Sequence, residues 1–148
     1  MAEYASRLLP DVIDNAFPGH WVAQWAFVVV AMRRAIRAFV HFAYPAYTAS
    51  SLAFVPLHTY DREAADTILS LYSLNGLAHL AASLLHAVVL LRYQSLVPLM
   101  YLLLLLELIA AKWVAASLPI KTQGQPPSAK YSVLVLPIIA ALLGLSLA

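Results

Sequence analysis

The chain has 148 residues, enough for one domain, and 63% of them are hydrophobic whereas only 11% are charged. An average soluble domain has about 25% charged residues, and a chain of this length could not bury so much apolar surface in water, so we expect an integral membrane protein. The small net charge of +2, without a basic run that contains aromatic residues, argues against a nucleic-acid partner, and the lack of cysteine excludes disulfides, zinc–thiolate sites, iron–sulfur clusters and thiol nucleophiles.

The first 18 residues do not resemble a cleavable signal, because they contain Glu3, Asp11 and Asp14 and lack a basic start followed by an apolar core. Their pattern predicts a short amphipathic segment on the membrane surface, with breaks at Pro10 and Pro18. Its apolar residues are Leu8, Leu9, Val12, Ile13 and Phe17. A frayed polar tail is the alternative.

The first predicted span covers residues 20–44 and contains arginines near its middle. Residues 21–32 are apolar except for Gln24, but they cover only half of a membrane, which takes about 20 residues to cross. Either one helix continues through the arginines to Tyr44, or a short helix ends at the membrane interface near Arg33. We favour the single long helix, because aromatic residues typical of membrane interfaces stand near both ends. They are Trp21, Trp25, Tyr44 and Tyr47.

Two further spans are predicted at residues 67–91 and 96–116. The acids before residue 67 suit the positive end of a helix dipole, and Pro98 falls in a first turn, where its missing N–H costs little. Residues 92–95 form a tight turn, so we expect these two spans to pack as an antiparallel hairpin. The connection at residues 50–60 is expected to lie along the membrane surface.

The fourth span is predicted at residues 131–148, after a polar loop at residues 121–130, and Pro137 is expected to kink it. The expected fold is therefore all-α: one domain, residues 1–148, that forms a four-helix transmembrane bundle. Four basic residues against two fall on the side away from the termini, so the positive-inside rule places both termini outside the cytoplasm. The expected location is the cell inner membrane.

Glu107 is the first candidate for chemistry. It stands near the centre of the third span, where a lone ionised carboxylate is costly, so it is expected to pair with another group or to face protein. Arg33, Arg34 and Arg37 reach a similar depth in the single-helix interpretation of the first span. The four residues predict either an ion pair that holds the two helices together, or a proton relay or anionic substrate site.

A polar seam on the second span is the second candidate. Its residues recur at steps of three and four, which places them on one face of a helix. They are Tyr72, Asn75, Gly76, His79, Ser83 and His86. Small and polar residues mark helix–helix contacts in lipid, so we interpret the seam as a packing face.

His79 and His86 could instead be ligands. They are seven residues apart, or about 10 Å along a helix, so one haem iron could not use both. His41 on the first span could pair with one of them. No zinc-binding spacing is present, and we predict neither a metal nor a cofactor.

Motifs of soluble enzymes are absent from the sequence. It contains no phosphate-binding loop, dinucleotide fingerprint, nucleophile elbow or H-E-x-x-H motif. We therefore predict a non-enzymatic protein with no catalytic residues.

The hairpin region has a familiar layout. The motif Leu90-Leu-Arg-Tyr93 is followed by Pro98-Leu-Met-Tyr-Leu-Leu-Leu-Leu-Leu-Glu107, and Leu74-Asn75-Gly76-Leu77 and Trp25-Ala-Phe27 precede it. Over residues 21–112 the chain resembles small uncharacterised four-helix bacterial membrane proteins and is broadly similar to DoxX-like proteins. The resemblance implies a four-helix fold in an inner membrane and carries over no catalytic residue.

Three functions follow as hypotheses. The first is an accessory subunit of a larger membrane assembly or a homo-oligomer, with the bilayer, other membrane subunits or its own copies as partners. The second is a small transporter or proton-coupled site that uses Glu107, the arginines, His79 and His86. The third is a haem- or quinone-binding subunit of a membrane oxidoreductase.

Overall fold

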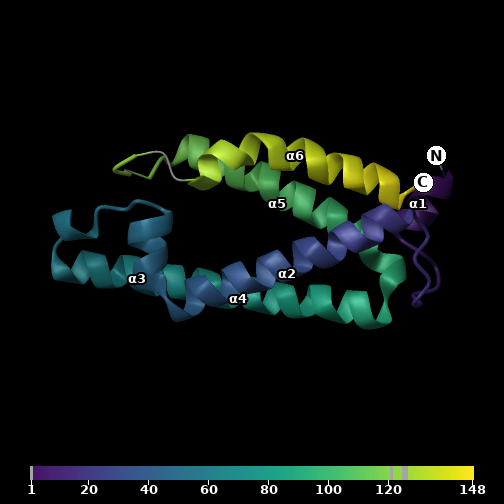
Figure 1. The fold of residues 1–148 in the computed structure, drawn as a ribbon, viewed down its shortest axis with the longest axis horizontal. Helices are drawn as coiled ribbons and strands as arrows, with labels where there is room; N and C mark the ends of the chain where they lie inside the picture. Colours follow the sequence, from purple (N-terminus) through teal and green to yellow (C-terminus); the bar gives the residue numbers. More distant parts are fainter. Residues whose placement is uncertain (1, 121, 125–126) are drawn as a thin grey trace.

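The computed structural model describes residues 2–120, 122–124 and 127–148, with side chains described at all of these except residues 2–3 and 127–133. Within these ranges the chain is helical, without a strand. Four long helices run along the long axis of the molecule, and both chain ends lie at the same end of it (Figure 1). The expected all-α class is confirmed.

The N-terminal segment is helical only at its start. Helix α1 (Ala2–Leu8) is followed by irregular chain up to His20. The expected break near Pro10 is present, and the apolar side chains of Leu9, Val12 and Ile13 are exposed. The backbone oxygen of Asp14 accepts hydrogen bonds from the Ser95 backbone nitrogen at 3.3 Å and from the Ser95 hydroxyl at 3.0 Å. These bonds tie the segment to the connection between two later helices.

Helix α2 (Trp21–Ala43) is a single helix that passes through all three arginines. The His20 ring accepts a hydrogen bond from the Val22 backbone nitrogen and caps its start, and the helix ends at Ala43, with Tyr44 as its C-cap just before Pro45. Its buried face consists of small or apolar residues. They are Ala23, Phe27, Ala31 and Ala38.

The connection after α2 folds back against it. It contains α3 (Pro45–Tyr47), the π-helical turn η1 (Thr48–Leu52) and the 3-10 turn η2 (Leu57–Thr59). Thr48 and Ala49 are buried, and the Thr48 hydroxyl donates to the Val40 carbonyl oxygen at 3.4 Å. The first part of this connection is thus packed on protein.

Helix α4 (Arg62–Arg92) begins five residues before the predicted span. The Asp61 carboxylate accepts a hydrogen bond from the Ala64 backbone nitrogen at 2.7 Å, so it caps the helix and fixes the earlier start. The 3-10 turn η3 (Gln94–Leu96) leads into α5 (Val97–Ser117), with Pro98 in the first turn as expected.

Helices α4 and α5 are joined by a tight turn but do not pack along each other as predicted. Helix α4 packs along α2, and α5 packs along α6 (Pro127–Ser146), so the molecule consists of two antiparallel helix pairs (Figure 1). Gly76 explains the first pair: a side chain there would collide with the Phe42 backbone nitrogen and lie 2.7 Å from the His41 carbonyl carbon. Helix α6 continues through Pro137.

The hydrophobic core lies at the end that holds the termini. Phe27, Val89 and Tyr101 are among its fully buried or nearly buried members, and they come from three helices. The remaining members are Ala23, Val97, Met100, Leu104 and Ile139. At the same end, the His20 backbone nitrogen donates to the Leu145 carbonyl oxygen at 2.9 Å, which connects α6 to α2.

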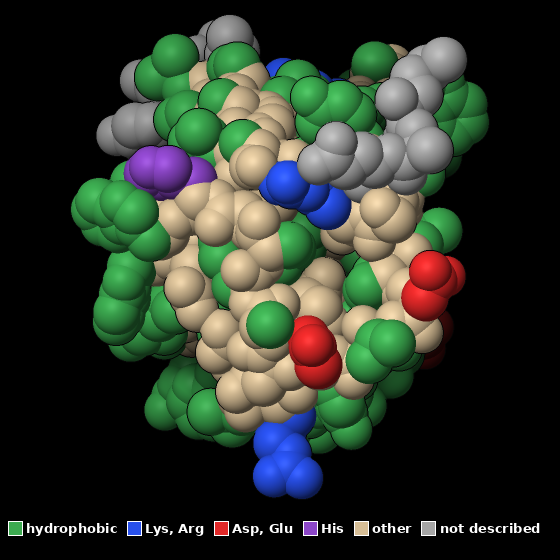
Figure 2. All heavy atoms as spheres, turned by 90° about the vertical axis from the view of Figure 1, so that its right-hand side faces the viewer, with side chains coloured by type: hydrophobic (Ala, Val, Ile, Leu, Met, Phe, Trp, Pro, Cys, Tyr) green, Lys and Arg blue, Asp and Glu red, His purple; other side chains and the backbone are tan. Residues whose placement is uncertain are grey.

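Two helices are long and apolar enough to cross a membrane by length and composition, Arg62–Arg92 and Gln94–Ser117. Only 22% and 17% of their most apolar stretches are buried within the chain, so most of their apolar surface is exposed in the described structure. Helix α2 does not qualify, and the described part of α6 that is apolar, Leu134–Ser146, is shorter. Figure 2 views the end with the termini: charged side chains and backbone lie on this face, and hydrophobic side chains occupy much of its rim.

Candidate functional site

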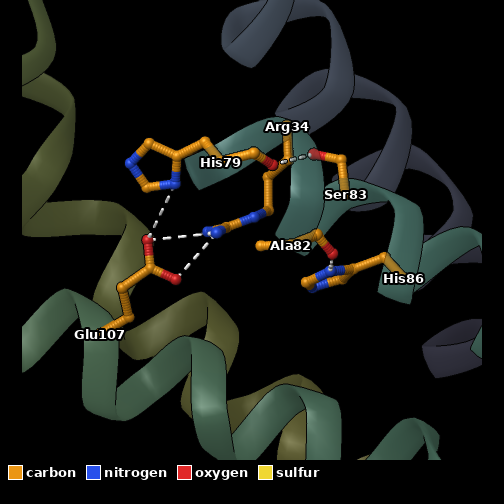
Figure 3. A network of polar contacts seen from close by, with 6 residues as sticks. All are labelled: Arg34, His79, Ala82, Ser83, His86 and Glu107. Carbon is orange, nitrogen blue, oxygen red and sulfur yellow. Dashed lines mark hydrogen bonds and ion pairs between the residues drawn. The ribbon is translucent and has the colours of Figure 1, made fainter. Parts of the chain in front are cut away.

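A charged cluster connects the two helix pairs at the middle of the molecule. Nη2 of Arg34 on α2 donates to both carboxylate oxygens of Glu107 on α5, at 3.1 and 2.8 Å. Nδ1 of His79 on α4 lies 3.8 Å from Oε1 of the same carboxylate. Figure 3 shows both side chains pointing toward Glu107 from separate helices.

The helical register positions each member of this cluster. Arg34 follows Ala31 and precedes Ala38, two small buried residues on the face of α2 that packs on its neighbour. Glu107 comes three residues after buried Leu104, so it faces the same side of α5 as the core. The arginine side chain is 20% exposed and the carboxylate 43%, so this ion pair lies at the edge of the helix contact and not in its core.

Only one of the three candidate arginines contacts Glu107. Arg33 and Arg37 are exposed, and the side chain of neither makes a hydrogen bond or ion pair with another described residue. They lie four residues apart on the flank of α2, about 100° or less from Arg34 around the helix. Both line an open hollow of about 480 Å³. Its other lining residues are Ile36, Val40, His41, Tyr47 and Leu52.

The residues of the polar seam on α4 differ in how deeply they are buried. Gly76, Ser83 and His86 are buried, Tyr72 and His79 are partly buried, and Asn75 is exposed. Tyr72 lies beside His41 of α2, with ring centroids 6.3 Å apart. Asn75 is thus the one proposed seam residue that is exposed.

His86 is packed between aromatic residues. Its ring stacks on Phe27 at 5.5 Å, and Phe27 meets Tyr101 edge-on at 5.3 Å. Its Nδ1 donates to the Ala82 carbonyl oxygen at 2.7 Å, which leaves Nε2 of the neutral ring as an acceptor. Ser83 satisfies its hydroxyl in a similar way, on the His79 carbonyl oxygen at 2.8 Å (Figure 3).

Two buried nitrogen atoms of this region have no hydrogen-bond partner in the described part of the chain. They are Nε2 of His86 and Nε of Arg34, which is a donor. An unpaired buried polar atom typically costs about 1–3 kcal/mol. These two atoms could therefore form hydrogen bonds that the described side chains do not supply.

One of the two histidine pairs considered from the sequence, His41 with His86, cannot bind a single haem iron. His41 lies beside Tyr72 and His86 lies 14 residues further along α4, a rise of about 21 Å. The two rings cannot face one iron. Among the described residues, no group of three His, Cys, Asp or Glu side chains converges as metal ligands.

Sequence reasoning missed three polar contacts that fix the end with the termini. The buried Tyr101 hydroxyl donates to the Ala23 carbonyl oxygen at 2.7 Å, the Gln24 amide donates to the Gln94 amide oxygen, and Asp14 bonds Ser95. Gln24 and Gln94 are isolated amides near the same predicted membrane edge, so their pairing had a signal in the sequence. The sequence gives no signal for the other two contacts, because their acceptors are backbone oxygen atoms.

No protein-family model, curated protein or solved structure matches this chain. The similarity to DoxX-like membrane proteins therefore stays a prediction from the sequence.

Proposed function

We propose that the chain is a four-span protein of the cell inner membrane, without enzymatic activity, that acts as an accessory subunit of a larger membrane assembly or as a homo-oligomer. The observation that carries the proposal is the Arg34–Glu107 ion pair, which joins two helix pairs whose outer surfaces are apolar. Both carboxylate oxygens accept hydrogen bonds from one guanidinium, so this carboxylate is occupied by a structural contact and is poorly placed to act as a general base.

The exposed surface supports a location in lipid. Large hydrophobic side chains are more than half exposed on α2, α4, α5 and α6, among them Trp25, Leu84, Trp113 and Leu134. Contiguous apolar surface of this extent marks contact with a membrane or with another protein. The four long helices alternate in direction, so each could cross the same bilayer.

Helix α2 also carries a surface suited to another helix. We define the α2 stripe as six exposed apolar residues at steps of three and four, which is the spacing of a coiled-coil seam. They are Trp21, Trp25, Val29, Met32, Ile36 and Phe39. This stripe lies opposite the buried face of α2, so it is free to pack on a partner subunit or a second copy.

The experiment isolates the tagged protein from membranes. We expect it to remain in the membrane after an alkaline carbonate wash, and to elute from a mild-detergent column either with defined partner proteins or at more than one copy per particle. Release by carbonate would contradict the membrane proposal. A partner-free monomer would contradict the accessory or oligomeric role.

A pair of matched variants tests the α2 stripe. Met32→Ala with Ile36→Ala removes two of its exposed side chains, and Leu71→Ala with Leu74→Ala removes two equally exposed side chains from α4. We expect the first variant to lose the partner or the second copy and the control to keep it. Equal retention by both would show that the stripe faces lipid.

A proton-coupled site is the second candidate, and a separate observation favours it. Nε2 of His86 and Nε of Arg34 are buried without a hydrogen-bond partner in the described part of the chain, and Arg34 and His79 both contact Glu107, so this region could hold ordered water for proton movement. Purified protein in vesicles with a pH-sensitive dye tests this function. A proton flux that His86→Phe abolishes in a normally folded protein would favour the proton-coupled function over the structural one.

A further inference from the structure

The side chains of Arg33 and Arg37 form no ion pair with any described residue. Side chains four residues apart on a helix are neighbours, and two like charges there oppose each other. Both arginines line the same hollow and make no ion pair with the described residues. In the four-span arrangement they lie at membrane depth, where an unpaired cation is costly. An anion bound in the hollow would compensate both positive charges.

No acid in the described part of the chain is placed to form an ion pair with Arg33 or Arg37. The sequence contains seven acidic residues, and Glu107 is the only one after residue 66. Its carboxylate is already bound by Arg34. The other six acids stand in the N-terminal segment or at the start of α4, outside the predicted spans. A second copy of the chain would bring the same set, so it offers no unused acid at this depth.

The hollow has the chemistry of a site for an amphiphile. Its volume of about 480 Å³ is within the range of small-molecule sites, about 300–1,000 Å³. Two guanidinium groups can bind the oxygens of one carboxylate or phosphate in a planar, forked geometry. The apolar side chains of Ile36, Val40 and Leu52 line the same space, and it is open at the surface, where lipid chains could enter.

His41 and Tyr47 complete the lining. Nδ1 of His41 is engaged with the Arg37 carbonyl oxygen at 2.8 Å, which fixes the ring beside the arginines and leaves Nε2 available. Tyr47 belongs to α3, in the connection that folds back onto α2. The hollow is therefore built by two segments that are held in place by packing at Thr48 and Ala49.

We propose that this hollow binds the anionic head group of an acyl-chain amphiphile, held by Arg33 and Arg37 with the chain along Ile36, Val40 and Leu52. The head group is a carboxylate or a phosphate ester. The proposal rests on the membrane location given under the proposed function, but it does not depend on the Arg34–Glu107 contact or on a partner subunit.

The test measures lipids retained by the detergent-purified protein, by native mass spectrometry, after addition of oleate, phosphatidylglycerol or phosphatidylcholine. We expect retention of oleate or phosphatidylglycerol to exceed that of phosphatidylcholine by roughly tenfold or more. Preference for oleate identifies a free fatty acid, and preference for phosphatidylglycerol identifies a bilayer phospholipid. Equal retention of all three, or of none, would overturn the proposal.

Matched variants locate the site. Arg33→Gln with Arg37→Gln should remove the preference, whereas Arg62→Gln with Arg92→Gln, which takes the same charge from the ends of α4, should keep it. Leu52→Trp keeps both arginines and fills the hollow, so it should also lower retention. A retained preference in the first and third variants would place the anion elsewhere. Protein found in the soluble fraction would contradict the membrane location. The lipid preference is measured only on protein extracted from membranes, so failure of the lipid site and failure of the membrane location give different results.

Discussion

Nη2 of Arg34 donates to both carboxylate oxygens of Glu107, and through this contact α2 of one helix pair is joined to α5 of the other. The two residues are 73 positions apart in the sequence. His79 approaches the same carboxylate from α4, so three helices meet at one acid. Contacts between the pairs are otherwise concentrated in the core near the termini.

Removing the acid should therefore loosen the association of the two pairs. In Glu107→Gln the guanidinium of Arg34 loses its anion, and because the pair is only partly buried we expect a loss of about 1–3 kcal/mol in the free energy of unfolding. Arg34→Gln should cost a similar amount. The double variant should cost less than the sum of the two, by about 0.5–3 kcal/mol, which is the measure of direct coupling. Thermal or denaturant unfolding in detergent provides the three values.

The neighbouring arginines are the controls for this cycle. Arg33→Gln and Arg37→Gln remove the same charge from the same helix but break no ion pair of the described structure. Their effects should add to that of Glu107→Gln without coupling. Coupling at Arg33 or Arg37 and none at Arg34 would mean that the observed pair is not the one that stabilises the protein.

Gly76 should tolerate no side chain. Gly76→Ala places a methyl group against the backbone of His41 and Phe42, which cannot move without separating α2 from α4, so we expect a loss of about 1–3 kcal/mol. Gly144→Ala is the matched control, because a methyl group there meets nothing within 4 Å and α6 gains a better helix former. Unfolding temperatures in detergent compare the two. Equal temperatures would show that α2 and α4 do not approach closely at Gly76.

The helices could be predicted from the sequence, but their pairing could not. Apolar runs with prolines and acids at their boundaries gave helices close to the observed ones, and capping by Asp61 explains why α4 begins earlier than its apolar run. The tight turn at residues 92–95 suggested that α4 packs on α5. Helix α4 instead packs on α2, because Gly76 allows a closer approach to the Phe42 backbone than the leucine-rich surface of α5 does.

The candidate site was predictable at the level of residue types. One acid and three arginines at similar depth pointed to an ion pair, but all three arginines fall on adjoining faces of α2 and periodicity cannot choose among them. Arg34 is selected by its position between Ala31 and Ala38 on the packed face. His79 was assigned to a packing seam or, in the alternative, to a transporter or proton-coupled site with Glu107. Its approach to Glu107 depends on the position of α5, which no local pattern encodes.

Tyr101 should stabilise the end of the molecule that holds the termini. Its hydroxyl is buried and donates to the Ala23 carbonyl oxygen, so Tyr101→Phe leaves that oxygen without this donor at an expected cost of about 0.5–1.5 kcal/mol. The ring contact with Phe27 is kept. Tyr44→Phe, at a tyrosine that is 58% exposed, should change the unfolding temperature little. An equal effect of both substitutions would contradict a specific role for the Tyr101 hydroxyl.

The final prediction concerns topology. Figure 1 places both chain ends at the same end of the molecule, and Nη1 of Arg7 donates to the Leu147 carbonyl oxygen at 3.1 Å. Four helices of alternating direction then require both termini on one side of the membrane. Reporters fused before Met1 and after Ala148 should be active on the same side, and a reporter inserted at Gly124, between α5 and α6, should be active on the other. Because more basic residues fall on the side of Gly124, we expect that side to be the cytoplasm.

Opposite locations of the two termini would contradict four spans and would make α2, with its three arginines, a segment that does not cross. A further variant distinguishes a segment α2 that does not cross the membrane from an artefact of the reporter fusion. Replacing Arg33, Arg34 and Arg37 together by leucine makes α2 apolar enough to cross by composition alone. If α2 already crosses, this variant leaves the reporter pattern unchanged. If it does not cross, the added apolar span moves the N-terminal reporter to the other side, and the C-terminal reporter stays where it is.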